Sequence, residues 1–142
     1  MLIVSKIKIS YWVMVSDYQG VKAMLESAEE ILGYAVEEFD KAVRVKDVLL
    51  YRNAADKAFL ALIVAMNAFI VAKLNVIPKN HSERRKLLRE LGREDLRALY
   101  SDLMRTLHEE AFYEGVYEPE EVNYAIGKIK ELINEFKAQL SL

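Results

Sequence analysis

The most apolar stretch of the sequence lies near its middle, between Ala54 and Ala72. Only Asp56, Lys57 and Asn67 interrupt it with polar side chains. A helix that is apolar on nearly every face belongs at the centre of a protein. A membrane span needs about 20 mostly apolar residues without such interruptions. The pattern therefore predicts the core helix of a bundle, with no membrane association.

One side of this predicted helix is mixed in character. At about 100° per residue, Asp56, Lys57, Leu60, Val64 and Asn67 share that side. Two interpretations are open. Either the face packs against a neighbouring helix with Asn67 hydrogen-bonded inside, or it forms the seam of a dimer whose register Asn67 fixes.

Two other segments repeat apolar residues at alternating spacings of four and three, which is typical of helical bundles. In the first segment, about residues 17–46, these are Val21, Leu25, Ala28, Leu32, Ala35, Phe39 and Ala42. In the last they are Val122, Ile126, Ile129, Ile133, Phe136 and Leu140. The short break at Asp47 makes the first segment and the core helix antiparallel neighbours.

Typical boundary residues divide the rest of the chain. Asn80 is a good N-cap and opens a short helix that stops at Gly92. A fourth helix follows from about residue 94 to 114, with Gly115 as its end and Pro119 as the first residue of the last helix. We therefore predict an all-α, antiparallel up-and-down helical bundle of four long helices and one short one.

Residues 1–16 follow a different pattern, because apolar and polar positions alternate there with the period of a strand. Either this extended segment docks on the bundle or on a second chain, or the natural start lies downstream, for example at Met14. The predicted organisation is an N-terminal extended segment, residues 1–16, and a bundle domain, residues 17–142.

Composition narrows the classes of function. The chain has 142 residues, a net charge of −2 and no cysteine, which excludes disulfides and thiolate chemistry and fits a reducing, cytoplasmic location. Abundant Glu, Lys and Arg with little Gln indicate a thermophile. Only two histidines are present, and we predict neither a metal site nor a cofactor.

The start of the short helix is the best candidate for a binding site. Free N–H groups at a helix N-terminus attract anions, and two arginines follow in its first turns. We expect the end of the fourth helix to meet this loop at one end of the bundle. The candidate anion- or nucleotide-binding residues are Asn80, His81, Arg84, Arg85, His108 and Tyr113. Alternatively, Asn80 only caps the helix, His81 packs, and the arginines form a solvated face.

Two carboxylates of the fourth helix, Glu110 and Glu114, fall on its inward side by helical spacing. Burial there requires a partner, for which Arg52, Lys57 and His81 are candidates. The predicted buried polar residues are Asp56, Lys57, Asn67, Glu110 and Glu114.

Several of these features together resemble the archaeal PaREP family. They are Ala54-Ala55-Asp56-Lys57-Ala58 at the start of the core helix, Pro78-x-x-His81, and the stretch from Leu107 to Gly115. The resemblance covers about residues 17–140. It implies membership of the HEPN superfamily of helical bundles, which are commonly dimeric and include ribonucleases, toxins and partners of small nucleotidyltransferases.

The nuclease members of that superfamily carry an arginine four to six residues before a histidine, and neither His81 nor His108 has one. We therefore expect a HEPN-like binding or interaction module, homodimeric and associated with a nucleotide, with RNA or with a protein such as a nucleotidyltransferase. The alternatives are a metal-independent, toxin-like ribonuclease with a non-standard His/Arg site, and a structural dimer subunit of a larger complex. No catalytic residue is assigned.

Overall fold

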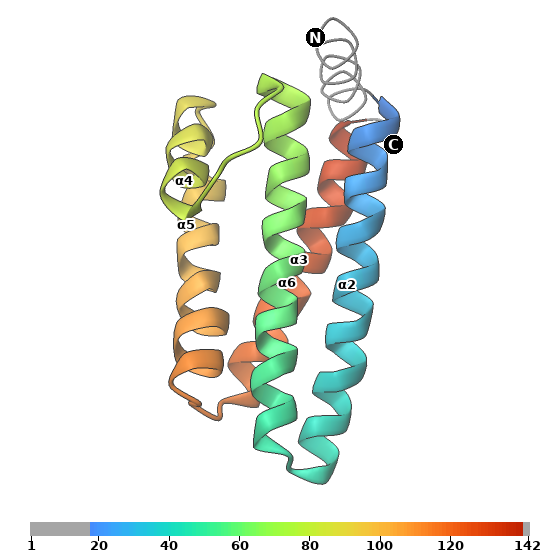
Figure 1. The fold of residues 1–142 in the computed structure, drawn as a ribbon, viewed down its shortest axis with the longest axis vertical. Helices are drawn as coiled ribbons and strands as arrows, with labels where there is room; N and C mark the ends of the chain where they lie inside the picture. Colours follow the sequence, from blue (N-terminus) through green and yellow to red (C-terminus); the bar gives the residue numbers. More distant parts are fainter. Residues whose placement is uncertain (1–17, 141–142) are drawn as a thin grey trace, which may run out of the picture.

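The computed structural model describes residues 18–140, which form a bundle of helices without a strand. The predicted extended segment, residues 1–16, lies outside this range. In chain order the elements are α2 (Tyr18–Val45), α3 (Val48–Leu74), α4 (His81–Glu90), α5 (Glu94–Leu103), the π-helix η1 (Met104–Tyr113) and α6 (Pro119–Gln139). The predicted all-α bundle is confirmed (Figure 1).

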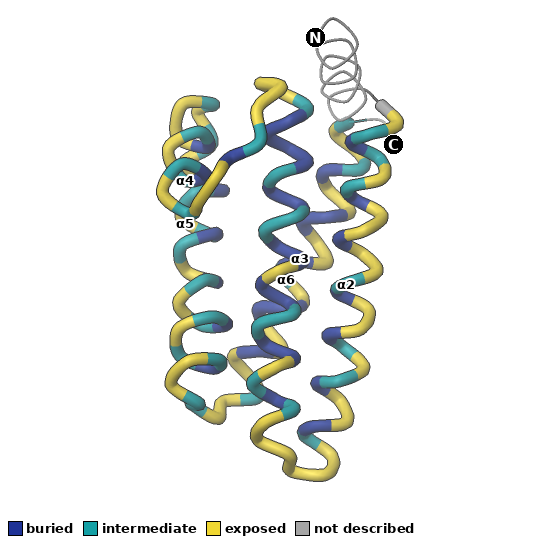
Figure 2. The backbone as a smooth tube through the Cα atoms, in the orientation of Figure 1, coloured by how far each residue is buried: buried dark blue, intermediate teal, exposed yellow. Residues whose placement is uncertain are grey.

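Helix α3 is the centre of the bundle, since it contacts α2, α4, α6 and η1. Thirteen of its residues are buried, and the burial extends along most of its length (Figure 2). Its contact with α2 is the most extensive among the described elements. Both helices carry alanines without exposed surface, among them Ala28, Ala35, Ala58 and Ala65. Small side chains let two helix axes approach closely, because the interaxial distance depends on the residues between them.

Among the described helices, α3 alone is long and apolar enough to cross a membrane, and 56% of its most apolar window is buried inside the bundle. The core helix of a soluble protein passes the same test of length and composition. Its position between four other elements agrees with the prediction of a core helix.

The predicted helix boundaries depend on residues with left-handed or capping conformations. Lys46 has a φ of 56° after α2, and Asp47 then accepts a hydrogen bond from the Leu50 N–H at 3.0 Å, which caps α3. Asn75, with a φ of 53°, ends α3. The chain then folds back along α3, so α4 begins beside the middle of the bundle and not at its end (Figure 1).

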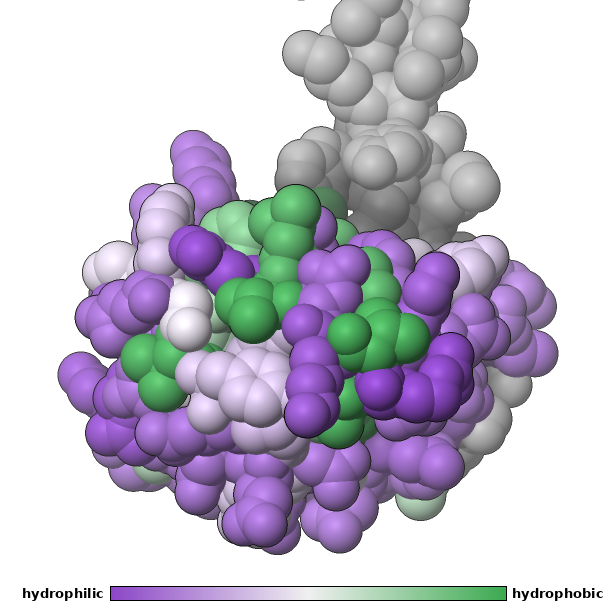
Figure 3. All heavy atoms as spheres, turned by 90° about the horizontal axis from the view of Figure 1, so that it is seen from below, coloured by the Kyte–Doolittle hydropathy of each residue, from purple (hydrophilic) through white to green (hydrophobic). Residues whose placement is uncertain are grey.

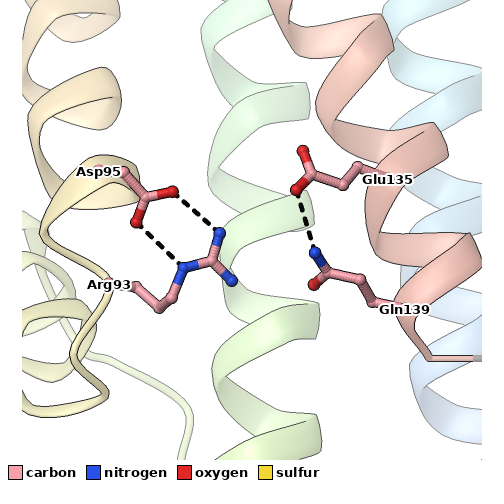
Figure 4. Close-up of polar contacts among 4 residues, drawn as sticks. All are labelled: Arg93, Asp95, Glu135 and Gln139. Carbon is pink, nitrogen blue, oxygen red and sulfur yellow. Dashed lines mark hydrogen bonds and ion pairs between the residues drawn. The ribbon is translucent and has the colours of Figure 1, made fainter.

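The corner between α4 and α5 is held by Arg93. Its guanidinium donates two hydrogen bonds of 3.0 Å to the Asp95 carboxylate and lies over the Phe69 ring of α3, 5.3 Å from its centroid. Figure 4 shows Arg93 pointing from this corner toward α6, where the Gln139 amide donates to Glu135 at 3.0 Å. The bidentate pair orients the Arg93 guanidinium, and its contact with Phe69 ties this corner to the core.

The predicted fourth helix is regular only in its first half. From Met104 onward the helix is a π-helix, in which a backbone N–H donates to the carbonyl five residues earlier. For example, the Glu114 N–H donates to the Glu109 carbonyl at 2.9 Å. π-Helices are rare, are mostly single turns, and occur often at functional sites, whereas η1 spans ten residues.

This π-helical hydrogen bonding corrects the predicted burial of two glutamates. Leu107 and Ala111 face the core, whereas Glu114 is exposed and the Glu110 side chain is 42% exposed. The nearest cation to Glu110 is Arg105, at 3.9 Å. An α-helical extrapolation past residue 104 was wrong because each π turn contains one more residue than the α-helical spacing assumes.

At the end of the bundle that carries the α2–α3 turn, three apolar side chains, Val45, Val48 and Leu49, are exposed. Figure 3 shows apolar patches on this end separated by hydrophilic side chains. Scattered exposed apolar residues are normal on soluble proteins.

Two leucines of α3 test the assignment of its core face. Leu62 has no exposed surface, and Leu60 is 47% exposed. We expect Leu62→Ala to lower the free energy of unfolding by about 2–5 kcal/mol, because it opens a cavity in a packed core. Leu60→Ala, the same substitution in the same helix, is expected to cost less than about 1 kcal/mol. Denaturant titration of both variants measures the difference, and equal losses would contradict the assignment.

Candidate functional site

An open pocket lies between α3, the start of α4 and η1, with a cavity volume of about 330 Å³. This is within the range of small-ligand sites. Helix α3 supplies most of its wall, and α4 and η1 each supply a histidine. The lining residues are Asn53, Asp56, Lys57, Phe59, Leu60, Ile63, His81, His108 and Phe112.

His81 reaches this pocket because it is the first residue of α4, at the end of the loop that returns along α3. Asn80 fixes the start of the helix, since its side chain accepts a hydrogen bond from the Glu83 N–H at 2.8 Å. The His81 ring then packs against Phe59 of α3, with 5.6 Å between the ring centroids.

Arg84, one turn after His81, is the one buried charged residue in the described part of the chain, with 5% exposure. Its Nε donates to Asn67 Oδ1 of α3 at 2.7 Å. Its Nη1 donates to the Tyr100 hydroxyl of α5 at 2.9 Å and lies 3.3 Å from His81 Nδ1. One guanidinium thus joins three helices through neutral acceptors.

These contacts determine the protonation of His81. The Tyr100 hydroxyl accepts from Arg84 and lies 2.5 Å from His81 Nδ1, so its own proton is free to donate to that nitrogen. Arg84 also only donates. Both neighbours are satisfied when Nδ1 is an acceptor, which places the proton of the neutral ring on Nε2. In addition, burial and then the charge of Arg84 lower the pKa of His81, which favours the neutral ring.

His108 of η1 has the opposite arrangement. Its Nδ1 lies 2.7 Å from the Asp56 carboxylate of α3. An ionised carboxylate only accepts hydrogen bonds, so Nδ1 carries the proton and Nε2 of the neutral ring is an acceptor. Both side chains are partly exposed, with 26% and 36% of their surface accessible.

Aromatic rings surround the two histidines, whose centroids are 6.2 Å apart. Phe59 stacks on His108 with 5.2 Å between the ring centroids. The Phe112 ring lies nearly parallel to the His108 ring, with 5.9 Å between the centroids. Tyr113, 66% exposed, meets His108 edge-on at 5.0 Å. The histidines therefore lie in an apolar, aromatic setting that is open to solvent on one side.

Lys57 is the cation in the pocket wall, and it forms an ion pair with Glu38 of α2. The second carboxylate oxygen of Glu38 is buried without a hydrogen-bond partner within the range of residues described. Each charge of the pair thus has an opposite charge beside it.

Arg52 of α3 holds the C-terminal end of η1. Its Nε donates to the Phe112 carbonyl at 2.7 Å and its Nη2 to the Tyr113 carbonyl at 2.9 Å. These carbonyls belong to the unpaired end of the helix. Gly115 follows with a φ of 70°, and a side chain there would come within 3.1 Å of the Arg52 guanidinium. Arg52 and Gly115 thereby fix where His108 lies along α3.

The structure brings together His81, His108 and Tyr113, as predicted, but beside the middle of α3. The expectation that they meet at one end of the bundle is wrong, because the loop after α3 folds back along that helix. Asn80 acts as the cap of α4. Arg84 is buried, and its Nε and Nη1 are occupied by Asn67 and Tyr100 of the protein itself.

Arg85 is partly exposed and makes no hydrogen bond or ion pair that the structure records among residues 18–140.

Sequence reasoning missed Asn53, Phe59 and Phe112 as pocket residues, and it assigned Asp56 and Lys57 to burial. The mixed stripe of the core helix was the signal that pointed to this wall. Asn67 lies on the same stripe and is hydrogen-bonded within the chain, as the first of its two interpretations expected.

The adjacent arginines of α4 provide a matched test of the buried network. We expect Arg84→Lys to lower the free energy of unfolding by about 1.5–3 kcal/mol, because an ammonium group cannot reproduce the fork of bonds to Asn67 and Tyr100. Arg85→Lys is expected to change it by less than about 0.5 kcal/mol. Chemical denaturation of both variants measures these values. A neutral Arg84→Lys change would show that the network does not hold α4.

Comparison with known proteins adds one finding to this geometry. Residues 22–133 match the archaeal PaREP1/PaREP8 family. No curated protein and no solved structure matches the chain significantly. The match includes α3, α4, α5 and η1, and therefore every element that lines the pocket. Because it extends over most of the sequence, the chain belongs to the archaeal PaREP1/PaREP8 family.

Proposed function

We propose that the protein is a helical binding module whose pocket between α3, α4 and η1 takes a nucleotide or a short RNA. The observation that carries this proposal is the meeting of His81 and His108, from distant parts of the chain, inside an open pocket with aromatic walls. Convergent polar groups in an apolar pocket are the usual mark of a ligand site. A ten-residue π-helix supplies one of the two histidines, and π-helical segments are frequent at functional sites.

Aromatic side chains at the pocket suit a base. Phe112 lines it, and Tyr113 stands exposed beside His108. Stacking on such rings stabilises bound nucleotides by about 1–3 kcal/mol per base, independent of sequence. Placement of the chain in the cytoplasm and in the HEPN superfamily, and its assembly into a homodimer, remain predictions that accord with this proposal.

Arg85 is the cation available to a phosphate. It lies one turn beyond His81 on the same face of α4, and its charge acts on the His81 ring. Lys57 and Arg84 are already engaged by Glu38, Asn67 and Tyr100. The anion-binding role that the sequence suggested for both arginines is therefore proposed for Arg85 alone.

Fluorescence anisotropy with a short, labelled single-stranded RNA tests the proposal. We expect binding that weakens with salt, and an Arg85→Gln variant that binds several-fold more weakly. Loss of one phosphate contact should also make the slope of the logarithm of the binding constant against the logarithm of the salt concentration less steep by about 0.7. The control is Lys86→Gln, because Lys86 is the next residue along α4 and its side chain is 73% exposed. Absence of binding at low salt, or equal effects of the two variants, would overturn the proposal.

A second candidate function is metal-independent cleavage of RNA, and the Asp56–His108 hydrogen bond favours it. A carboxylate that holds the Nδ1 proton leaves Nε2 as a base. In such a reaction Nε2 takes the proton of a ribose 2′-hydroxyl while that oxygen attacks the adjacent phosphorus. The 5′-oxygen of the next nucleotide leaves and takes up a proton, which gives a 2′,3′-cyclic phosphate and a 5′-hydroxyl.

Cleavage in the presence of a chelator tests this candidate. We expect His108→Ala to lower the rate by about 10²-fold or more, the usual contribution of a general base. Lys86→Gln again serves as the exposed control. If the wild-type protein leaves RNA intact, or if cleavage survives His108→Ala, the ribonuclease candidate is eliminated and the binding module remains.

A further inference from the structure

Two ring nitrogens at the pocket have no partner in the described part of the protein. Nδ1 of His81 and Nδ1 of His108 are engaged by the network and by Asp56, whereas neither Nε2 has a recorded hydrogen bond. The only buried side-chain atom without a partner in this part of the chain is a Glu38 oxygen. Both Nε2 atoms are therefore open to solvent on residues that line the pocket.

The two free nitrogens are chemically different. When both rings are neutral, the hydrogen bonds described above leave a proton on Nε2 of His81 and a lone pair on Nε2 of His108. The pocket thus presents one donor and one acceptor, on rings whose centroids are 6.2 Å apart.

The fixed charges around the pocket oppose one another. Lys57 is paired with Glu38. The negative charge of Asp56 lies beside His108, and the positive charge of Arg84 lies beside His81. Together these four groups contribute no net charge. The charge left over is that of Arg85, which also acts on His81, so an anion is attracted toward Arg85 and not between the four balanced groups.

We propose that the His81–His108 pair recognises the edge of a nucleobase, where an N–H donor stands beside an acceptor, and does not bind the phosphate. This inference rests on the proposed function and names the part of the nucleotide that enters the pocket. Nε2 of His108 accepts from the base, and Nε2–H of His81 donates to it. The phosphate stays outside, toward Arg85.

A phosphodiester fits this pair poorly. Its free oxygens only accept, so it satisfies His81 but places a negative oxygen against the lone pair of His108. The Watson–Crick edge of a base offers a donor and an acceptor side by side, and proteins read unstacked bases through such edges. The ring of Phe112, which flanks His108 at the pocket wall and is partly exposed, is suited to the apolar face of the same base.

Asp56 has the role of a positioning residue in this scheme. Its carboxylate can only accept, so it holds one tautomer of His108. An amide at this position offers both a donor and an acceptor, and Asp56→Asn therefore releases the constraint. Because Asp56 is partly exposed, we expect the variant to fold.

The tautomers can be measured without a ligand. In protein labelled with ¹⁵N at histidine, at a pH where the imidazoles are neutral, we expect a protonated Nδ1 in His108 and a protonated Nε2 in His81. Asp56→Asn should give a mixed signal for His108 and leave that of His81 unchanged. The same protonated nitrogen in both rings of the wild-type protein would overturn the inference.

The ligand is tested with uridine and adenosine, with 3-methyluridine and N6,N6-dimethyladenosine, and with ribose 5-phosphate. We expect at least one of the two nucleosides to shift both Nε2 resonances, and its methylated counterpart, which lacks the N–H, to bind at least about tenfold more weakly. Asp56→Asn should weaken the same nucleoside several-fold.

Four outcomes of the ligand test would overturn the inference. If ribose 5-phosphate binds at these nitrogens as well as the nucleosides do, the site reads phosphate, and the proposed binding of nucleotides survives in that form. If a methylated nucleoside binds as well as its parent, the edge is not read. If no nucleoside binds while the labelled RNA does, RNA is held elsewhere, and if neither binds, the proposed function fails as well.

Discussion

A buried guanidinium holds the short helix α4 to the rest of the bundle. A ten-residue helix is marginal on its own, and besides Arg84 the only buried residue of α4 is Leu88. The bonds from Arg84 to Asn67 and Tyr100 replace the apolar contacts that a longer helix would make. Burial first, and then the charge of Arg84, lower the pKa of His81 and favour its neutral form. The interaction that fixes α4 in position thus also fixes a proton within the pocket.

Helix α3 both forms the core of the bundle and lines the pocket. It packs against α2 and α6 in the core, and residues of its mixed stripe form the wall of the pocket. Asp56 and Asn67 on that stripe each hold one of the two networks, since Asp56 binds His108 and Asn67 binds Arg84. The rigid core is therefore the surface on which both histidines are aligned, and rigid elements position binding groups more accurately than loops do.

The sequence predicted features that depend on local spacing. The seam of α2, the cap at Asn80, the start of α6 at Pro119 and the central place of α3 all follow from periodicity and from the chemistry of helix ends. It did not distinguish Arg84 from Arg85, because the difference lies in Asn67 and Tyr100, which are distant along the chain. The π-helix was missed for a similar reason: Arg52, more than fifty residues earlier, holds its end, and the apolar spacing up to Leu107 is that of an ordinary helix.

The π-helix makes the number of residues between Leu103 and Gly115 a property of the site. A turn of π-helix contains one more residue than a turn of α-helix, so a chain with one residue fewer in this segment would close an ordinary α-helical turn and keep His108 against Asp56. An α-helix over the full length of the segment would instead rotate the residues after Leu103 and turn His108 away from Asp56. Among related sequences, a gap of one residue in this segment is therefore compatible with the pocket, whereas α-helical spacing applied to the full length would misplace the histidine.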